Sequence, residues 1–219
     1  HFPPDTKLAA PPLGEAWLEV RWRLKEVGPP GLLQDPDFPF ALGAFFSAVR
    51  DRFPYKADLE ASRAPLEILP HILRHQFWSG EGKWPVLQLG PGIASVNFTQ
   101  PYSWDSFKTE ALYLRSNLLE AYSGKFPQLD VVTLRYLNAE PFDFAENDIL
   151  EFLQSGLNTT LILPKYVPGE FASKAIPTSL SLRATFDLSL PKATGALTVA
   201  TGARSLTPTL GVPENPTSV

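Results

Sequence analysis

Residues 84–122 constrain the fold more than any other stretch, because they predict a β-hairpin followed directly by a long amphipathic helix. Two β-rich runs flank the Gly-Pro-Gly at residues 90–92, and glycine adopts the positive φ that such a tight reversal needs. Ser103 is a favourable N-cap residue and Gly124 is a natural C-terminal stop for the helix. Apolar residues between them recur every three or four positions, which is the spacing of one helix face. The predicted core-facing stripe is Trp104, Phe107, Ala111, Leu114, Leu118 and Tyr122.

Alternation of apolar and polar residues predicts strands on both sides of this unit. It is clearest in residues 13–24 and 178–188, and it recurs in residues 71–79 and 129–138. Residues 80–83 form a short turn before the hairpin, so the strands around it should form an antiparallel meander. The predicted inward positions are Ala16, Leu18, Val20, Trp22 and Leu24 in the first strand, and Leu180, Leu182, Ala184, Phe186 and Leu188 in the late one.

A second main helix is predicted over residues 40–53, where the chain has a largely aromatic stripe at helical spacing and stops before Pro54. Further along, residues 146–154 predict a short helix and residues 159–163 a short strand. Residues 196–201 predict a strand that pairs with residues 178–188. The core-facing stripe of the second main helix is Leu42, Phe45, Phe46, Val49 and Phe53.

Together these elements predict an α+β fold: a mainly antiparallel, twisted sheet with two principal helices packed on one face. Ferredoxin-like and TATA-binding-protein-like arrangements are the nearest analogies, and a shared fold does not transfer function. The core runs β-α-β-β-β-α-β over residues 13–140, and an additional helix and strands occupy residues 141–203. We expect one domain over residues 13–203, an extended proline-rich arm at 1–12 and a loose or truncated tail at 204–219.

The composition limits the classes of function. A net charge of −4 gives the chain no overall field that would attract nucleic acid or an anionic membrane. The absence of cysteine excludes disulfides, thiolate nucleophiles and cysteine zinc sites. No apolar run is long enough to span a membrane and no targeting segment is evident, so we expect a cytoplasmic protein. No motif predicts a cofactor.

Motifs that carry chemistry are weak in this sequence. The Gly-Pro-Gly joins two predicted strands and lacks the lysine and hydroxyl of a phosphate loop, so it predicts a turn. His71 and His75 are four residues apart, a spacing of metal ligands on a helix, but they fall on a predicted strand and we expect no metal there. Glu15 and Glu19 could pair as catalytic carboxylates, yet carboxylates at alternating strand positions are normally solvated, so catalysis is the minority interpretation.

The most informative polar feature is a set of charged side chains on the outward faces of predicted strands. The structural interpretation is cross-strand pairing of glutamates with arginines. The functional interpretation is a polar sheet face, with Trp17 nearby, that binds a ligand or partner, since arginines and aromatic residues on a sheet can stack bases. The candidate site residues are Glu15, Glu19, Arg21, Arg135, Tyr136, Asn138 and Arg183.

Three segments carry a resemblance to one family: PPLGEAWLEVRW, LQLGPGIASVNFTQPYSWDSFKTE and LRYLN. They resemble a sporadically distributed family of uncharacterised prokaryotic proteins, whose members usually continue into a further strand and a final helix. The resemblance implies a self-contained α+β protein and no known activity. Because the chain also lacks methionine and starts at His1, we expect the natural chain to be longer. The matching positions are Pro11, Pro12, Glu15, Glu19, Arg21, Gln88, Asn97, Tyr102, Trp104, Phe107, Arg135, Tyr136 and Asn138.

Two hypotheses about function follow. The leading one is a non-enzymatic binding or assembly protein that self-associates through a sheet edge or face. Its expected partners are a second copy of the chain or an unknown protein, and neither a membrane nor nucleic acid. The alternative is an enzyme that acts on nucleotide or nucleic acid through Arg21, Arg135 or Arg183 and a nearby carboxylate. An enclosed pocket with strongly shifted ionisable groups would favour the enzyme. A charged face with internal pairs, together with a broad apolar patch, would favour assembly.

Overall fold

The residues that the computed structural model describes fall into two compact units, one within residues 1–139 and one within residues 140–209. This division by contacts does not test whether residues 13–203 form one domain, which stays a prediction. The predicted arm at 1–12 and tail at 204–219 lie outside the described residues. The described ranges are 13–66, 70–99, 101–124, 128–139, 142–143, 146–161, 180–188 and 194–201.

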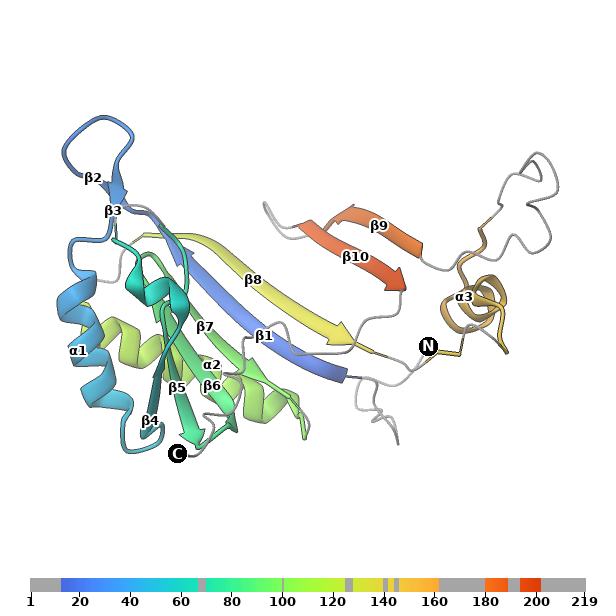
Figure 1. Cartoon of the computed structure of the whole chain (residues 1–219), viewed down its shortest axis with the longest axis horizontal. Helices are drawn as coiled ribbons and strands as arrows, with labels where there is room; N and C mark the ends of the chain where they lie inside the picture. Colours follow the sequence, from blue (N-terminus) through green and yellow to red (C-terminus); the bar gives the residue numbers. More distant parts are fainter. Residues whose placement is uncertain are drawn as a thin grey trace. The chain divides into compact units, whose positions relative to one another are not determined.

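The first unit is built on a six-stranded sheet in the order β4-β5-β6-β7-β1-β8 (Figure 1). Every neighbouring pair in this sheet is antiparallel, which confirms the predicted α+β class. The strands are β1 (Leu13–Trp22), β4 (Tyr55–Asp58), β5 (His75–Gly80), β6 (Lys83–Gly90), β7 (Ile93–Phe98) and β8 (Leu129–Asn138); a separate short ribbon joins β2 (Lys25–Glu26) to β3 (Leu33–Gln34).

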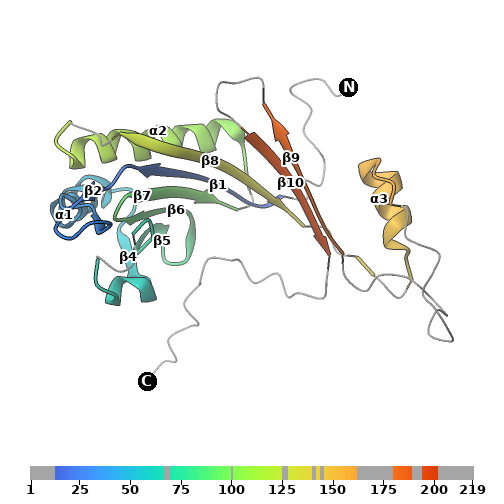
Figure 2. The ribbon, with the colours of Figure 1, turned by 90° about the horizontal axis from the view of Figure 1, so that it is seen from above.

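Two helices, α1 (Phe38–Val49) and α2 (Trp104–Ala121), pack on the same face of this sheet, as predicted. Seen from above, α2 runs along one face and the short turn of helix η1 (Glu60–Arg63) lies on the other (Figure 2). Aromatic contacts dominate the helix-side core, where Phe45 meets Phe77 of β5 and Phe107 meets Phe98 of β7, each with ring centroids 5.4 Å apart. The strands add Ala16, Trp22, Leu87, Leu89, Ala94 and Val96 to this core.

The Gly-Pro-Gly forms the predicted tight turn between β6 and β7. Gly92 has a φ of +76°, and a Cβ there would lie 2.6 Å from the ring of His71 and from Leu24. A Cβ on Gly90 would collide with the backbone carbonyl of Ile72. Both glycines are therefore required by close packing, one of them also by its backbone conformation.

A buried carboxylate joins this turn to two other parts of the first unit. Asp35 Oδ2 accepts hydrogen bonds from Trp22 Nε1 (3.0 Å) and from the backbone N–H of Gly92 (3.2 Å). It also accepts one from the hydroxyl of Tyr122, at 2.7 Å. The end of β1, the β6–β7 turn and the C-terminal end of α2 thus meet at one side chain.

Four details of the sequence prediction are wrong. Trp104, the first residue of α2, is 52% exposed and does not belong to the buried core. α1 begins at Phe38, with a proline in its first turn, and ends at Val49. β5 begins only at His75, since His71 has a positive φ of 56° that is incompatible with a strand. Residues 55–58, for which the sequence predicted no strand, form β4, which pairs with β5.

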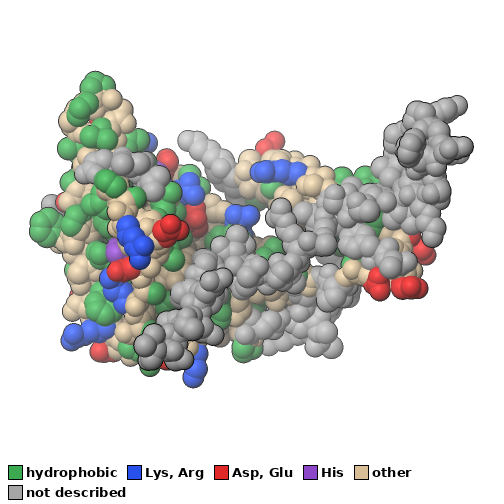
Figure 3. All heavy atoms as spheres, viewed as in Figure 1, with side chains coloured by type: hydrophobic (Ala, Val, Ile, Leu, Met, Phe, Trp, Pro, Cys, Tyr) green, Lys and Arg blue, Asp and Glu red, His purple; other side chains and the backbone are tan. Residues whose placement is uncertain are grey.

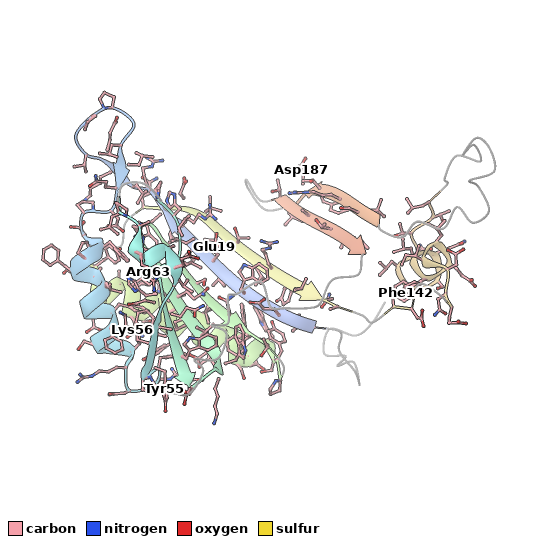
Figure 4. All side chains as sticks on the ribbon, in the orientation of Figure 1. Glu19, Tyr55, Lys56, Arg63, Phe142 and Asp187 are labelled. Carbon is pink, nitrogen blue, oxygen red and sulfur yellow. The ribbon has the colours of Figure 1, made fainter. Side chains whose placement is uncertain are left out.

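The second unit contains α3 (Ile149–Leu157) and a hairpin of β9 (Leu180–Asp187) and β10 (Thr194–Thr201). Asp148 caps α3 by accepting a hydrogen bond from the N–H of Leu150, and Phe142 packs against Phe152 of the helix, with ring centroids 5.2 Å apart (Figure 4). The predicted hairpin is confirmed. The prediction that Phe186 and Leu188 face inward is wrong, since they are 53% and 47% exposed. Residues 159–161 form no strand.

We predict that Asp35→Ala lowers the free energy of unfolding by about 4 kcal/mol, because three hydrogen bonds to one buried carboxylate are lost together. Urea unfolding measures the change. Asp37→Ala is the matched control: its carboxylate is exposed and pairs at the surface with Lys25, so the variant should lose less than about 1 kcal/mol. Equal losses in both variants would contradict the role given to Asp35.

Candidate functional site at the β1–β8 edge of the sheet

β8 is the last strand of the sheet and leaves one edge open. It pairs with β1 along nearly its whole length, with Leu18 opposite Leu134 and Trp17 opposite Arg135. Among the described residues, no strand pairs with its other edge. An edge strand presents a row of backbone N–H and C=O groups that can pair with another chain.

The side chains of β8 are apolar and exposed on both faces. Val132, Leu134 and Tyr136 lie on the helix side, as the register with Ala16, Leu18 and Val20 of β1 shows. Leu129, Val131 and Leu137 are also exposed, and the six side chains are between 37% and 58% accessible. The two helices therefore cover the middle of the sheet and leave its last strand uncovered.

β8 lacks the devices with which proteins usually protect an edge strand. Its ten residues contain no lysine, no proline and no glycine, and the charged residues are Asp130 and Arg135 alone. The only register irregularities in its pairing with β1 are at its two ends. Natural edge strands are commonly short, bulged or charged, because a long apolar edge promotes association. The length and apolar composition of β8 therefore favour pairing with another strand.

The face of the sheet opposite the helices carries polar residues in register across five strands; we call it the polar face. Gln76 on β5 lies opposite Gln88 on β6, and Gln88 lies opposite Ser95 on β7. The row continues to Glu19 on β1 and Thr133 on β8 (Glu19 is labelled in Figure 4). Gln76 and Gln88 are fully buried, which is unusual for glutamine.

Hydrogen bonds connect part of the polar face to Glu15. Asn97 Nδ2 donates to Glu15 Oε1 at 2.9 Å, and the Ser95 hydroxyl lies 2.9 Å from both Gln88 Oε1 and Asn97 Oδ1. Both side-chain polar atoms of Gln76 and the amide nitrogen of Gln88 form no hydrogen bond within the described part of the chain. The face therefore holds hydrogen-bonding capacity that this part of the chain does not use.

Glu15 departs from the sequence prediction, which placed it outward and solvated. Its side chain is 3% exposed. Burial raises the pKa of the Glu15 carboxyl above the usual 4.5, while the hydrogen bond from Asn97 and the charge of Arg135 offset part of the shift. The prediction was wrong because alternation fixes which face a residue occupies and not whether that face is covered.

The arginines of the polar face also have partners. Arg21 Nε donates to Glu19 at 2.7 Å along the same strand, and the Arg135 guanidinium lies over the Trp17 ring at 4.5 Å. The predicted cross-strand Glu–Arg pairs are thus replaced by one pair within β1 and one cation–π contact between β1 and β8. A guanidinium that is stacked or paired in this way is less available to bind an anion.

The structure separates the remaining predicted site residues. Tyr136 lies on the helix side, where its hydroxyl is 3.1 Å from that of Tyr102; burial and this hydrogen bond raise the pKa of Tyr102. Asn138 ends β8 opposite Leu13. Arg183 lies on β9 in the second unit, opposite Thr198. Glu15, Glu19, Arg21 and Arg135 are the predicted residues that share one face.

Sequence reasoning did not assign Gln76, Gln88, Ser95 and Asn97 to a common face. The signal was available: each is a polar residue at an alternate position of an otherwise apolar strand, as in LQL and SVN. Only the register between strands shows that these positions line up.

Two further polar features lie at the other end of the sheet. An open hollow of about 450 Å³ is lined by Glu60, Ala61, Arg63 and Ala64 of the η1 region. Acidic and basic side chains gather around β4 and β5 (Figure 3), where Asp58 pairs with Lys56 (2.8 Å) and with His75 (2.7 Å). Within the described ranges, no group of three or more histidine, aspartate or glutamate side chains is arranged to hold a metal ion.

Comparisons of the chain with protein-family models, with curated proteins and with solved structures find no match. The family resemblance and the ferredoxin-like or TATA-binding-protein-like analogy therefore stay predictions. In the part of the chain that the structure describes, no helix has the length and apolar character needed to cross a membrane.

We predict that Glu15→Gln stabilises the protein at neutral pH. Because the pKa of Glu15 is raised in the folded state, the unfolded state ionises first as the pH rises above the usual 4.5, and folding loses stability until the folded carboxyl also ionises. Glutamine stays neutral and keeps an acceptor for Asn97.

Urea unfolding at about pH 7 and about pH 4 tests this prediction, since the stabilising effect should be present at the higher pH and shrink towards zero at the lower one. An Asn97→Leu variant, which lacks the hydrogen bond that lowers the pKa, should titrate Glu15 at a higher pH by NMR. A stability difference that is the same at both pH values would contradict the assignment.

Proposed function

We propose that this protein is a non-enzymatic assembly module that associates by adding a strand to the open edge of β8. The observation that carries the proposal is a ten-residue edge strand with exposed apolar side chains on both faces and no partner strand among the described residues. Strand addition uses the unpaired backbone groups for affinity and alternate side chains for specificity.

The energetics favour association at this edge. Exposed apolar side chains gain about 25 cal/mol for each Å² that they remove from water. Cross-strand apolar or aromatic pairs add roughly 0.2–1 kcal/mol each. Val132, Leu134 and Tyr136 would bury area on one face of the sheet, and Val131 and Leu137 would do so on the other.

The polar face gives less support to the enzyme hypothesis. An arginine and carboxylate site needs charged groups that converge on a substrate. Here Glu19 is paired with Arg21, Arg135 is stacked on Trp17, and Glu15 accepts from Asn97. These contacts hold the sheet face together and leave its charges largely satisfied. We therefore assign the polar face a stabilising role within the sheet, and we propose assembly through β8 as the function.

We predict that wild-type protein elutes above the 24.2 kDa mass of one chain in size-exclusion chromatography with light scattering, and that Leu134→Lys returns it to one chain. A charge placed in an apolar contact costs about 3 kcal/mol, which corresponds to roughly a 100-fold weaker assembly. Leu112→Lys is the matched control, since Leu112 is 53% exposed, against 44% for Leu134, and belongs to α2 and not to the edge strand.

Three outcomes are informative. Assembly that is lost in Leu134→Lys and kept in Leu112→Lys supports the proposal. Assembly that survives in both variants places the contact elsewhere on the molecule. A wild-type protein that is a single chain at every concentration contradicts self-assembly. Thermal unfolding at concentrations low enough for the wild type to be a single chain should be the same in all three proteins, because both side chains are exposed and assembly adds no stability there.

A further inference from the structure

The sheet of the first unit has two edges, and they differ. β4 has four residues, among them Lys56 and Asp58, which form an ion pair. Such a short, charged strand resists pairing with another chain. β8 is long and apolar by comparison. Head-to-tail association, in which β8 of one copy pairs with β4 of the next, is therefore disfavoured; it would build a ring or an open filament in place of a dimer.

We infer that β8 pairs antiparallel with β8 of a second copy of this chain, about a two-fold axis through Leu134. This inference rests on the proposed function and adds to it the identity of the partner and the register of pairing. A two-fold axis perpendicular to the sheet puts the helix-covered faces of both copies on the same side. Helix-side residues of one copy then lie opposite helix-side residues of the other. One residue of β8 must then lie opposite itself.

An axis at Leu134 matches the chemistry of every pair. Leu134 lies opposite the partner's Leu134, and Val132 lies opposite the partner's Tyr136. On the polar side, Val131 meets the partner's Leu137 and Thr133 meets the partner's Arg135. Asp130 meets the partner's Asn138 at the ends of the strand. Apolar residues thus pair with apolar residues, and each charged residue pairs with a neutral polar one.

Neighbouring registers are worse. An axis at Thr133 sets Asp130 opposite Tyr136 and Val131 opposite Arg135. Moving the axis to Arg135 places two arginines directly opposite each other, and like charges in that position are destabilising. An axis at Val132 sets Asp130 opposite Leu134. The Leu134 register alone among these four avoids a charge beside an apolar side chain and a like-charge pair.

The proposed pairing also joins the polar faces of the two copies. Thr133 is the β8 neighbour of Glu19, so the partner's Arg135 would enter the row that already holds Glu19. The result is one continuous sheet made from two six-stranded sheets.

Disulfide trapping tests the register without background, because the chain contains no cysteine. Residues directly opposite in an antiparallel pair have Cβ atoms about 4.5–5.5 Å apart, close to what a disulfide spans. Leu134→Cys should therefore give a covalent dimer under mild oxidation. Val132→Cys is the matched control on the same face: its two copies would be about 13 Å apart along the strands and should stay unlinked.

A second arm uses two different chains. Val131→Cys and Leu137→Cys should each remain unlinked alone and form a covalent dimer when mixed. This pattern, together with the Leu134→Cys dimer, supports the inference. If Leu134→Cys stays unlinked while Leu134→Lys still abolishes assembly, the register is overturned and strand addition at β8 stands. If Val132→Cys links as fast as Leu134→Cys, the contact is non-specific and the inference is overturned.

Discussion

The carboxylate of Asp35 holds the first unit together at the point where its elements meet. It accepts hydrogen bonds from Trp22, Gly92 and Tyr122, which lie 13, 57 and 87 residues away along the chain. Burying a carboxylate costs free energy unless hydrogen bonds satisfy its oxygens, and these three donors offset that cost. Trp22 and Tyr122 also pack edge to face, with ring centroids 5.5 Å apart. Sheet, turn and helix are thereby fixed relative to one another.

The fixed position of the two helices has a consequence for the far side of the sheet. α1 and α2 contact each other and pack on β5, β6 and β7, where helix-side residues such as Phe77, Leu87 and Val96 are buried. β8 lies beyond them and keeps its apolar side chains exposed on both faces. The helices thus cover the middle of the sheet but not β8. Assembly through β8 would bury its exposed apolar side chains and pair its free backbone groups.

Much of this fold could be predicted from the sequence, because its strongest signals are local. Alternation predicted β1 and β8, and Ser103 predicted the start of α2 as its N-cap; in the structure its hydroxyl accepts a hydrogen bond from the Ser106 N–H. The turn at Gly92 followed from the need for a positive φ. β4 has only four residues and no clear alternation, so its place in the sheet depends on pairing with β5 and no local pattern showed it.

The candidate site was predicted less completely, since it depends on register and coverage. Glu15, Glu19, Arg21 and Arg135 were placed on strands correctly, but the alignment of Gln76 with Gln88 and Ser95 requires three strands to be paired. The burial of Glu15 could not be deduced from alternation, because the pattern does not reveal what lies over the face. The open edge of β8 likewise became visible only when the strand order placed it last.

Amide hydrogen exchange at two protein concentrations tests the central claim most directly, namely that β8 is an open edge that pairs with another chain. If β8 assembles, the amides of residues 129–138 that do not bond to β1 exchange more slowly at the higher concentration, because pairing with a second chain protects these backbone N–H groups. β4, the other edge strand, should show no such dependence and serves as the internal control. Exchange in β8 that is the same at both concentrations would contradict the claim.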